Sequence, residues 1–342
     1  MARLAPWPKL GRELVAATLQ LDRTTASPPL YRQVSSAIER LALTTPLGDE
    51  RALPTETELM EQFAVSRGTV RKATEELARE GLLRIEPGKG TFVVQAKKIR
   101  LLVWEKLLKV AKPDSRFDLD LSRFVPDFTE REKCDEQLCE LPGYRGSQTI
   151  FIAPDNSLEA FRVQALKDGK SIIVPTYGMR RGFVLLEGMR ISSHDRLLAA
   201  TLDGMERFGR YTTLNDLRNI ESVGLVVTGA VAVTKLGLHF GAGDGYFDLE
   251  WALLRHCELV TSKTPIAVSV HDCQVIDAQI RPAAHDAVVD IIVTPTKTRI
   301  CTPSLPKPDG ILWNEIRVGS WSSSPYVDEL VREKQSRRFS NK

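Results

Sequence analysis

The sequence predicts two domains, a small α+β winged helix-turn-helix followed by a larger α/β domain with a mainly parallel sheet. The chain has 342 residues, about twice the usual size of one domain. Three helical patterns and a hairpin pattern come first, and short β-rich runs then alternate with helical ones. We expect an N-terminal extension, the winged helix, the larger domain and a charged C-terminal tail, over residues 1–27, 28–95, 96–320 and 321–342.

Composition favours a soluble globular protein of the cytoplasm with no membrane partner. Hydrophobic residues make up 42% and charged residues 27% of the chain, which argues against long disorder. The apolar run from Val223 to Val233 is too short to cross a membrane, and the proline-broken N-terminus lacks the apolar region of a signal peptide. The five cysteines are scattered without zinc-ligand spacing, which fits reduced thiols in a cytosol.

Bulk charge does not by itself indicate a nucleic-acid partner. The net charge is only +3, and residues 1–95 carry 13 Lys and Arg against 12 Asp and Glu. A nucleic-acid surface would therefore have to come from local clustering of basic side chains.

Two helices are predicted before residue 64. Pro28 and Pro29 favour a helix start, and the apolar residues that follow recur at helical spacing, at Leu30, Val34, Ile38 and Leu41. Thr55 and Glu58 form a capping-box pattern that opens a second, short helix. Its apolar stripe consists of Leu59 and Phe63.

A third helix is predicted between Ser66, a good N-cap, and Gly81, a good stop. Its buried face carries Val70, Ala73 and Leu77. Arg67 and Arg71 are four residues apart and therefore share a different face, which points outward. An isolated pair of this kind is usually a solvated helix face. At the start of a recognition helix, however, the two guanidinium groups would reach bases and phosphates in the major groove.

A β-hairpin is predicted after the third helix. Leu82–Glu86 and Thr91–Val94 are rich in β-branched and apolar residues, and the turn Pro87-Gly88-Lys89-Gly90 joins them. Helix, turn, helix and hairpin in this order are typical of a winged helix.

This first domain resembles the GntR family of bacterial regulators over about residues 28–94. Four motifs carry the resemblance: Leu53-Pro54-Thr55-Glu56, Val65-Ser66-Arg67-Gly68-Thr69-Val70-Arg71, Glu80-Gly81-Leu82 and Gly88-Lys89-Gly90-Thr91-Phe92-Val93. The resemblance implies a homodimer on palindromic double-stranded operator DNA. It also implies DNA contacts from Ser66, Arg67, Thr69, Arg71, Gly88 and Lys89. Thr57 stands where some members carry an arginine, so one base contact differs.

The second domain is predicted from residue 96 onward. A helix over Leu101–Val110 precedes a charged, proline-dotted stretch over Pro113–Gly146, where we expect irregular chain with short helices. The β-rich runs that follow are Thr149–Ala153, Ser171–Pro175, Val223–Val233, Ile266–Val270 and Asp290–Thr294, with helices at Leu158–Lys167 and Leu249–Arg255. Ligands of parallel sheets bind beyond the carboxyl ends of the strands. We therefore expect a pocket near Pro175-Thr176, Thr228-Gly229, His271-Asp272 and Thr294-Pro295.

A glycine-rich run from Gly241 to Asp248 is the sharpest local feature of this domain. Gly241, Gly243 and Gly245 expose backbone N–H groups that are able to cradle phosphate. Such a run is about as often a plain turn, and this one lacks both the dinucleotide fingerprint and the Walker lysine.

Together with Gly237 and the helix after it, the glycine-rich run resembles the signature of the 5-formyltetrahydrofolate cyclo-ligase family. Further runs look like the methenyltetrahydrofolate synthetase domain-containing branch, namely Val270–Val275, His285-Asp286, Val289-Asp290 and Thr294–Thr296. The resemblance spans about residues 96–316 and implies a fold of the NagB, RpiA and CoA-transferase group. It further implies that a nucleotide or cofactor would contact Arg100, Gly241, Gly243, Gly245, Tyr246 and Asp248.

The resemblance also implies ATP and Mg²⁺ as cofactors. In that family, ATP with Mg²⁺ phosphorylates the formyl oxygen of 5-formyltetrahydrofolate, and ring closure gives 5,10-methenyltetrahydrofolate. This chain departs from the family at its cations. Ala96 stands where the family has a lysine, with Lys97 and Lys98 adjacent as substitutes, while His239 and Leu249 occupy usual arginine positions. Lost cations weaken transition-state stabilisation more than ligand binding, so the departures favour binding over turnover.

Two further side-chain hypotheses remain open on the sequence. Asp248 would either face Mg²⁺ or cap the following helix. His271, Asp272 and Cys273 would allow a nucleophile, but adjacent residues do not form a catalytic triad unaided. A cysteine beside a buried strand is usually a small apolar residue.

The sequence thus predicts a GntR-like DNA-binding transcription regulator, repressor or activator, whose second domain binds a small effector. That effector would be folate-like or a nucleotide. The alternative is an ATP-dependent 5-formyltetrahydrofolate cyclo-ligase that carries an autoregulatory DNA-binding domain.

Overall fold

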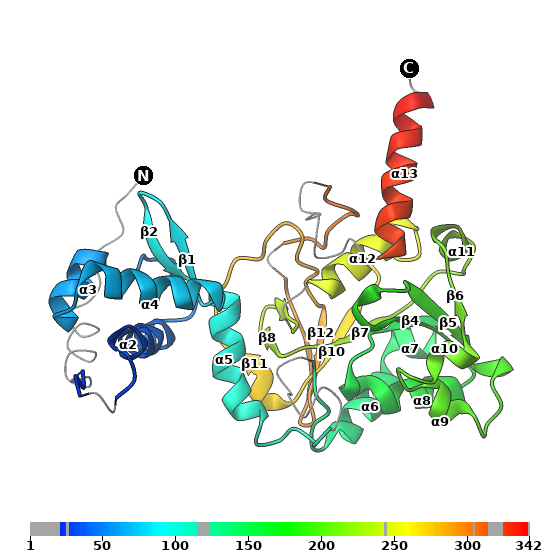
Figure 1. The fold of residues 1–342 in the computed structure, drawn as a ribbon. Coiled ribbons are helices and arrows are strands. Elements are labelled where there is room, and N and C mark those ends of the chain that lie inside the picture. The colour runs from blue at the N-terminus through cyan, green and yellow to red at the C-terminus, as the bar shows by residue number, and fades with distance from the viewer. Residues whose placement is uncertain are drawn as a thin grey trace. The chain divides into compact units, whose positions relative to one another are not determined.

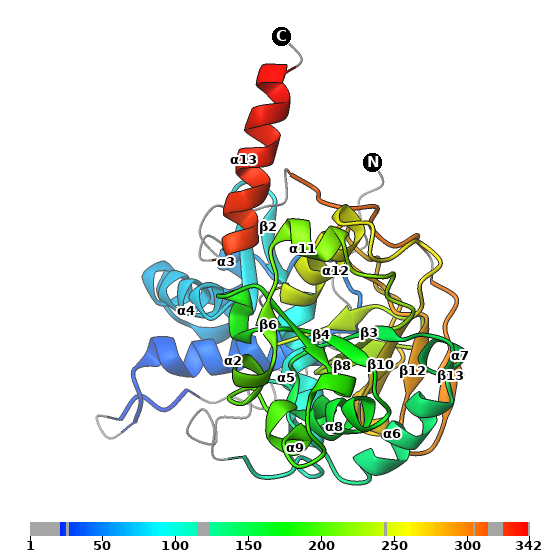
Figure 2. The same cartoon turned by 90° about the vertical axis from the view of Figure 1, so that its right-hand side faces the viewer.

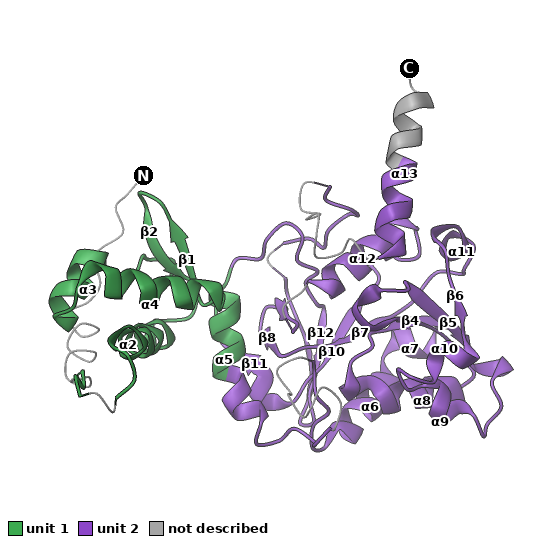
Figure 3. Cartoon of the chain, viewed as in Figure 1, with its two compact units in different colours: residues 1–102, 278–280 green, residues 103–277, 281–342 purple. Residues whose placement is uncertain are grey.

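The computed structural model describes residues 21–24, 27–114, 124–242, 245–303, 305–313 and 324–340 (Figure 1). The chain forms two compact units, shown in Figure 3. The first unit contains Met1–Leu102 and Ala278–Ile280, and the second contains Val103–Asp277 and Arg281–Lys342. The units divide within helix α5 (Gln95–Leu107), a few residues after the boundary expected at residue 96.

The first unit is a winged helix, as predicted. It consists of α2 (Leu30–Thr44), α3 (Glu56–Phe63), α4 (Arg67–Arg79), β1 (Leu83–Glu86) and β2 (Gly90–Val93). Its core lies between the three helices and the hairpin and includes the predicted stripes except Leu30, which is only partly buried. The buried members are Val34, Ile38, Leu41, Leu59, Phe63, Val70, Ala73 and Leu77. The hairpin is antiparallel, with Leu83 opposite Val93 and Glu86 opposite Gly90.

Local side-chain hydrogen bonds set the helix starts in this unit. The predicted capping box is present at α3, where Thr55 Oγ1 accepts from the Glu58 amide (3.3 Å) and the Glu58 carboxylate accepts from the Thr55 amide (2.8 Å). At α4 the Ser66 hydroxyl accepts from the Thr69 amide (3.3 Å). Between the two helices Ala64 adopts a left-handed conformation, with φ at 50°, which makes the turn tight.

The second unit is built on an eight-stranded sheet with the order β13-β12-β10-β7-β3-β4-β5-β6. Its parallel centre contains β12 (Ile291–Val293), β10 (Ile266–Ser269), β7 (Val226–Gly229), β3 (Thr149–Ile152) and β4 (Ser171–Pro175). The edges are antiparallel: β13 (Thr298–Ile300), β5 (Phe183–Glu187) and β6 (Arg210–Tyr211). The mainly parallel α/β prediction is therefore confirmed.

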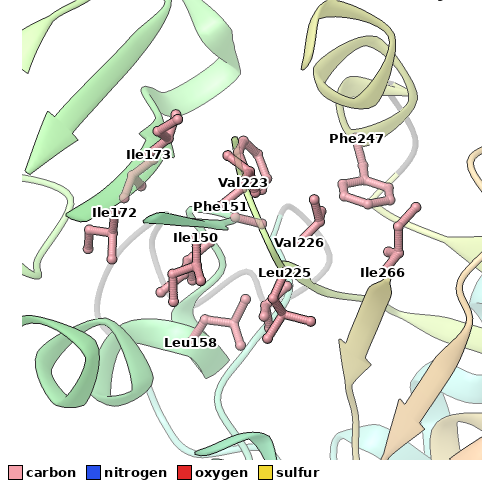
Figure 4. Close-up of a cluster of buried hydrophobic side chains, with 14 of the residues drawn as sticks. Ile150, Phe151, Leu158, Ile172, Ile173, Val223, Leu225, Val226, Phe247 and Ile266 are labelled. Atoms are coloured by element: carbon pink, nitrogen blue, oxygen red, sulfur yellow. The ribbon is translucent and has the colours of Figure 1, made fainter. Parts of the chain in front are cut away.

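Helices cover both faces of this sheet (Figures 1 and 2). On one face lie α6 (Arg131–Glu140), α8 (Glu159–Lys167) and α9 (Arg196–Ala199), and on the other α11 (Leu214–Arg218) and α12 (Tyr246–His256). The short helices α7 (Pro142–Arg145) and α10 (Met205–Phe208) complete the layers. Figure 4 shows the resulting core, in which side chains of β3, β4 and β7 meet Leu158 and Phe247.

Several elements of the structure differ from the sequence-based ones. The run Val223–Val233 is not one strand, because it divides into β7 and β8 (Ala232–Thr234), which belong to different sheets. Both strands are buried throughout, so the apolar pattern gave no sign of the break. The helix expected over Leu101–Val110 is α5, which begins at Gln95 and ends at Leu107.

The described part of the second unit also contains a three-stranded sheet. In it, β8 lies between β11 (Val275–Ile276) and β9 (His239–Phe240). The residues expected as a charged tail include helix α13 (Pro325–Ser340). The ring of Tyr326, near the start of this helix, is buried against Phe183. Among the described residues, no helix is long and apolar enough to cross a membrane.

Candidate functional site

The predicted DNA-contacting side chains of α4 lie together at its N-terminal end. The Ser66 and Thr69 hydroxyls share a hydrogen bond of 2.9 Å, and both belong to the first turn. The side chains of Arg67 and Arg71 are each 58% exposed, as expected for a helix face that points away from the core. The N-terminal end of α4 therefore presents two hydroxyls and two guanidinium groups, all of which bind phosphates or base edges.

The wing carries the remaining predicted contacts. Gly88 adopts a φ of 75°, and a side chain at this position would meet open space. The Lys89 side chain is 75% exposed, and its Nζ lies 3.2 Å from the Glu86 carboxylate. The turn is closed by the Lys89 amide, which donates to the Glu86 carbonyl at 3.0 Å. The tip of the hairpin is thus a glycine and an accessible lysine, which suits a close approach to a phosphate backbone.

In the second unit, the carboxyl ends of three central strands meet the start of α12. Asp155, just after β3, accepts a hydrogen bond from the Gly229 amide at the end of β7 (2.8 Å). The Gly229 carbonyl contacts His239 Nε2 (2.9 Å), and the His239 ring packs on Phe247, with 5.0 Å between ring centroids. A Cβ on Gly178, just after β4, would lie 3.4 Å from the Tyr246 hydroxyl. The structure thus places the loops after β3, β4 and β7 around the N-terminus of α12.

The glycine-rich run leads directly into that helix N-terminus. Gly245 is the N-cap of α12 and has a φ of 67°, a conformation that favours glycine. Gly241 and Tyr246 lie on either side of the loop, and Gly243 and Asp244 lie outside the described residues. A helix N-terminus preceded by glycine amides is a suitable anion site.

Asp248 makes contacts that differ from both sequence-based hypotheses. It lies in the first turn of α12, but the N-cap is Gly245, and Asp248 Oδ1 instead accepts from the Ala287 amide (2.8 Å). Burial, with a smaller effect of the nearby Asp286 carboxylate, raises the pKa of Asp248 to about 7. Within the described ranges no group of three or more His, Cys, Asp or Glu side chains is arranged to hold a metal. One carboxyl oxygen of Asp248 is thus engaged by a backbone amide.

A second carboxyl on α12 is even more deeply buried. The Glu250 side chain is 3% exposed, and no hydrogen bond to it is found within the described part of the chain. Burial raises its pKa well above the ordinary value, and the neighbouring carboxylates Asp155 and Asp248 raise it further. Sequence reasoning did not single out Glu250, although a glutamate on the apolar face of a helix was a visible signal.

The cations expected at this site are only partly available. Lys98 does not substitute for the missing lysine at Ala96, because its side chain is fully buried and donates to the Thr45 carbonyl and hydroxyl within the first unit. Leu249 is a buried apolar residue, and His239 contacts a carbonyl. Arg100 lies on α5 in the first unit.

A cavity of about 440 Å³ opens beyond the carboxyl end of β4. It is lined by Thr176, Tyr177, Arg180, Arg181, Leu202, Asp203 and Glu206. Both arginines are exposed, and Arg181 Nη2 lies 2.5 Å from Glu206 Oε2. Sequence reasoning predicted the strand end at Thr176 but missed these two arginines, which follow it by only four and five residues.

The proposed nucleophile around Cys273 has no support in the geometry. His271 Nδ1 accepts from the Cys273 amide (3.2 Å) and so acts as a helix cap rather than as a base. Burial raises the pKa of the Cys273 thiol, which disfavours the reactive thiolate. Gln274 fastens this loop to the Ala230 and Val231 carbonyls. The loop after β10 is therefore structural.

Comparison with known proteins identifies both units. Residues 95–295 match the model of the 5-formyltetrahydrofolate cyclo-ligase family, and residues 30–93 match that of the bacterial regulatory proteins, gntR family. The methenyltetrahydrofolate synthase domain-containing protein of Bos taurus is 31% identical over 257 residues, which are 73% of this chain and 65% of that protein. The human protein is 33% identical over 216 residues, which are 62% of this chain and 56% of that protein. The chain thus spans less than two thirds of these relatives.

The first unit has relatives of its own. The transcriptional repressor NagR of Bacillus subtilis is 41% identical over 69 residues, which are 20% of this chain and 28% of that protein. Among solved structures, the AraR DNA-binding domain with operator DNA is 38% identical, covers 22% of this chain and 95% of that one, and has a TM-score of 0.21. The Aquifex aeolicus 5,10-methenyltetrahydrofolate synthetase is 20% identical, covers 61% and 94%, and has a TM-score of 0.40. The chain belongs to the 5-formyltetrahydrofolate cyclo-ligase family and carries a GntR-type winged helix in front of that domain.

Proposed function

We propose that this chain is a cytoplasmic bacterial transcription regulator that binds double-stranded operator DNA as a homodimer and responds to a small anionic effector. The observation that carries the proposal is the exposed pair Arg67 and Arg71 at the first turn of α4, beside the Ser66 and Thr69 hydroxyls. In a winged helix this turn enters the major groove, and the wing, with Gly88 and Lys89, approaches the minor groove. The match to the gntR family model over these residues supports the same assignment.

DNA binding is tested by fluorescence anisotropy with the promoter of its own gene at several salt concentrations. We expect Arg67→Ala to weaken promoter binding about 10- to 100-fold, because a base or phosphate contact of a guanidinium is worth roughly 1–3 kcal/mol. Arg79→Ala, in the last turn of the same helix, removes the same charge and should change affinity little. Promoter affinity that does not depend on Arg67 would contradict the proposal.

The second unit is proposed to bind a folate-like molecule or a nucleotide at the carboxyl ends of β3, β4 and β7. Anionic groups would be held by the loop amides before α12, with Gly241, Gly245 and Tyr246 around them. Arg180 and Arg181 add two cations at the neighbouring cavity. A ligand with a carboxylate tail or a phosphate suits both the loop amides before α12 and the two arginines of the cavity.

Membership of the cyclo-ligase family favours a second candidate, an enzyme that uses ATP to close the 5-formyltetrahydrofolate ring. The helix N-terminus at Gly245 would suit the phosphates, whereas Leu249 supplies no charge at a position where the family usually has an arginine. We therefore expect no methenyl product, followed by its absorbance, when the full chain is mixed with 5-formyltetrahydrofolate, ATP and Mg²⁺. Sustained turnover that requires ATP would establish the enzyme instead.

A further inference from the structure

A single carboxylate, that of Glu56, lies between the two arginines of the recognition helix. Arg71 donates from Nε to Glu56 Oε1 at 2.9 Å, and Arg67 approaches Glu56 Oε2 with its Nε at 3.7 Å. The hydrogen bond that Arg71 donates to Glu56 raises the pKa of the Arg71 guanidinium. One glutamate thus contacts both side chains that are proposed to reach DNA.

The contacts leave the outer ends of both guanidinium groups available. Each arginine faces Glu56 with Nε, and within the described chain neither makes a hydrogen bond through its two Nη groups. A guanidinium held along its Nε edge presents its Nη groups as a fork, the arrangement that binds guanine or a phosphate in a bidentate manner. Glu56 therefore fixes the direction of two side chains that would otherwise sample many rotamers.

The backbone places Glu56 independently of these ion pairs. It is the first residue of α3, directly after the Thr55 capping box, and the tight turn at Ala64 sets α3 against α4. The carboxylate is itself 40% exposed. Ion pairs this exposed contribute little to folding stability, so the arrangement is better explained by an effect on the DNA complex.

The wing contains a similar arrangement, in which one carboxylate contacts two basic side chains. Glu86 pairs with Arg84 at 2.5 Å and with Lys89 at 3.2 Å. Each of these carboxylates offsets a cation and repels phosphates, and so lowers the net positive charge at the surface proposed to contact DNA.

We infer that Glu56 is a positioning residue that sets sequence specificity. Its carboxylate holds the side chains of Arg67 and Arg71 in the direction that reads bases, and its negative charge weakens sequence-independent binding to phosphates. This inference rests on the proposed DNA binding. Its consequence is that removal of the carboxylate strengthens binding to arbitrary DNA while it weakens discrimination. A purely structural role for Glu56 would change neither quantity.

The test uses the full chain and two duplexes of equal length and composition. One is enriched from a random library by the wild-type protein, and the other is its scrambled counterpart. For Glu56→Gln we expect about threefold tighter binding to the scrambled duplex and at least a tenfold lower ratio of specific to non-specific affinity. Glu61→Gln, on the exposed side of the same helix, removes the same charge away from the arginines and should leave that ratio within about twofold.

A second variant separates position from charge. Glu56→Asp keeps the charge but shortens the side chain, so the specificity ratio should fall while binding to the scrambled duplex stays unchanged. An unchanged ratio in both Glu56 variants, with a discriminating wild type, would overturn the role of Glu56 alone. A wild-type protein that enriches no sequence would overturn the proposed DNA reading and this inference together.

Discussion

Asp248 is a buried carboxyl whose charge state depends on pH near neutrality. Its pKa is raised from 3.8 to about 7, mainly by burial, with Asp286 acting in the same direction and His285 against it. In the unfolded chain the same group loses its proton near 3.8. Between these two values the folded state therefore binds more protons, and stability falls as pH rises. The penalty is absent below about pH 4 and complete above about pH 7.

Asp248→Asn tests this residue directly. Asparagine keeps the oxygen that accepts from the Ala287 amide but carries no charge. We expect the variant to match the wild type at pH 4 and to be more stable at pH 8, by roughly 4 kcal/mol as an upper bound. The measurement is the free energy of unfolding in urea at both pH values.

Glu221→Gln, at an exposed position, is the matched control and should show no such difference. If Asp248→Asn is no more stable than the wild type at pH 8, then Asp248 ionises freely in the folded protein. Its burial would then not govern the pH dependence.

The candidate site residues differ in how far sequence could predict them. Ser66, Arg67 and Arg71 follow from one helix pattern, because a cap and a four-residue spacing fix a helix face locally. Lys98 looked like a free cation by position, yet it is buried, because burial depends on packing against Thr45, more than fifty residues earlier. Arg180 was overlooked because a cavity depends on which loops meet.

At the scale of elements, Tyr326 is one of several side chains that attach α13 to the rest of the second unit. The Tyr326 hydroxyl accepts from the Phe183 amide (3.0 Å) and donates to the Thr212 carbonyl (2.7 Å). Gly182 has a φ of 76°, and a Cβ there would lie 2.8 Å from the Tyr326 ring. The glycine therefore leaves the space that the ring fills.

Tyr326→Phe keeps the ring and removes the hydroxyl. The buried Phe183 amide then loses its partner, and we expect a loss of about 1–3 kcal/mol in unfolding free energy. Thermal unfolding followed by circular dichroism measures the change. Val331→Ala lies on an exposed part of the same helix and should shift stability by less than about 0.5 kcal/mol. Equal effects of the two substitutions would mean that the hydroxyl does not anchor α13.

Elements with strong local signals were predicted well, and those that depend on partners were not. The capping box at Thr55 and the Ser66 cap gave the starts of α3 and α4 because each involves residues three apart. The edge strands β6 and β13 have only two and three residues, and their exposed side chains show no alternation. Such strands form because a neighbouring strand offers hydrogen bonds, which no local pattern records.

At the scale of the whole molecule, each unit has a core of its own. The core of the first unit is formed by the helices and hairpin of the winged helix, and that of the second by the sheet and its helices. Because the cores are separate, an effector bound to the second unit changes DNA affinity only if its binding is coupled to a change in the first unit. Thermodynamic linkage then requires operator DNA to change effector affinity by the same factor.

The effector, which any test of this linkage requires, is identified by a thermal-shift screen of folates and nucleotides. At a concentration of about 100 times its Kd, an effector should stabilise the chain by roughly 2.7 kcal/mol. Arg180→Ala should abolish the shift, because it removes a cation from the cavity beyond β4, whereas Arg67→Ala should leave it intact. Equal affinity of the effector for free and DNA-bound protein would show that the two activities are independent.

The assignment of Ala278–Ile280 to the first unit has a practical consequence for exchanging modules between regulators. This segment comes from the middle of the second unit's sequence, yet a Cβ on Gly48 would lie only 2.6 Å from the Gln279 carbonyl, and Gly48 has a φ of 80°. A chimera joined by one cut near residue 102 would leave that segment behind and expose the turn at Gly48. A chimera designed around this contact would carry Ala278–Ile280 together with residues 1–102.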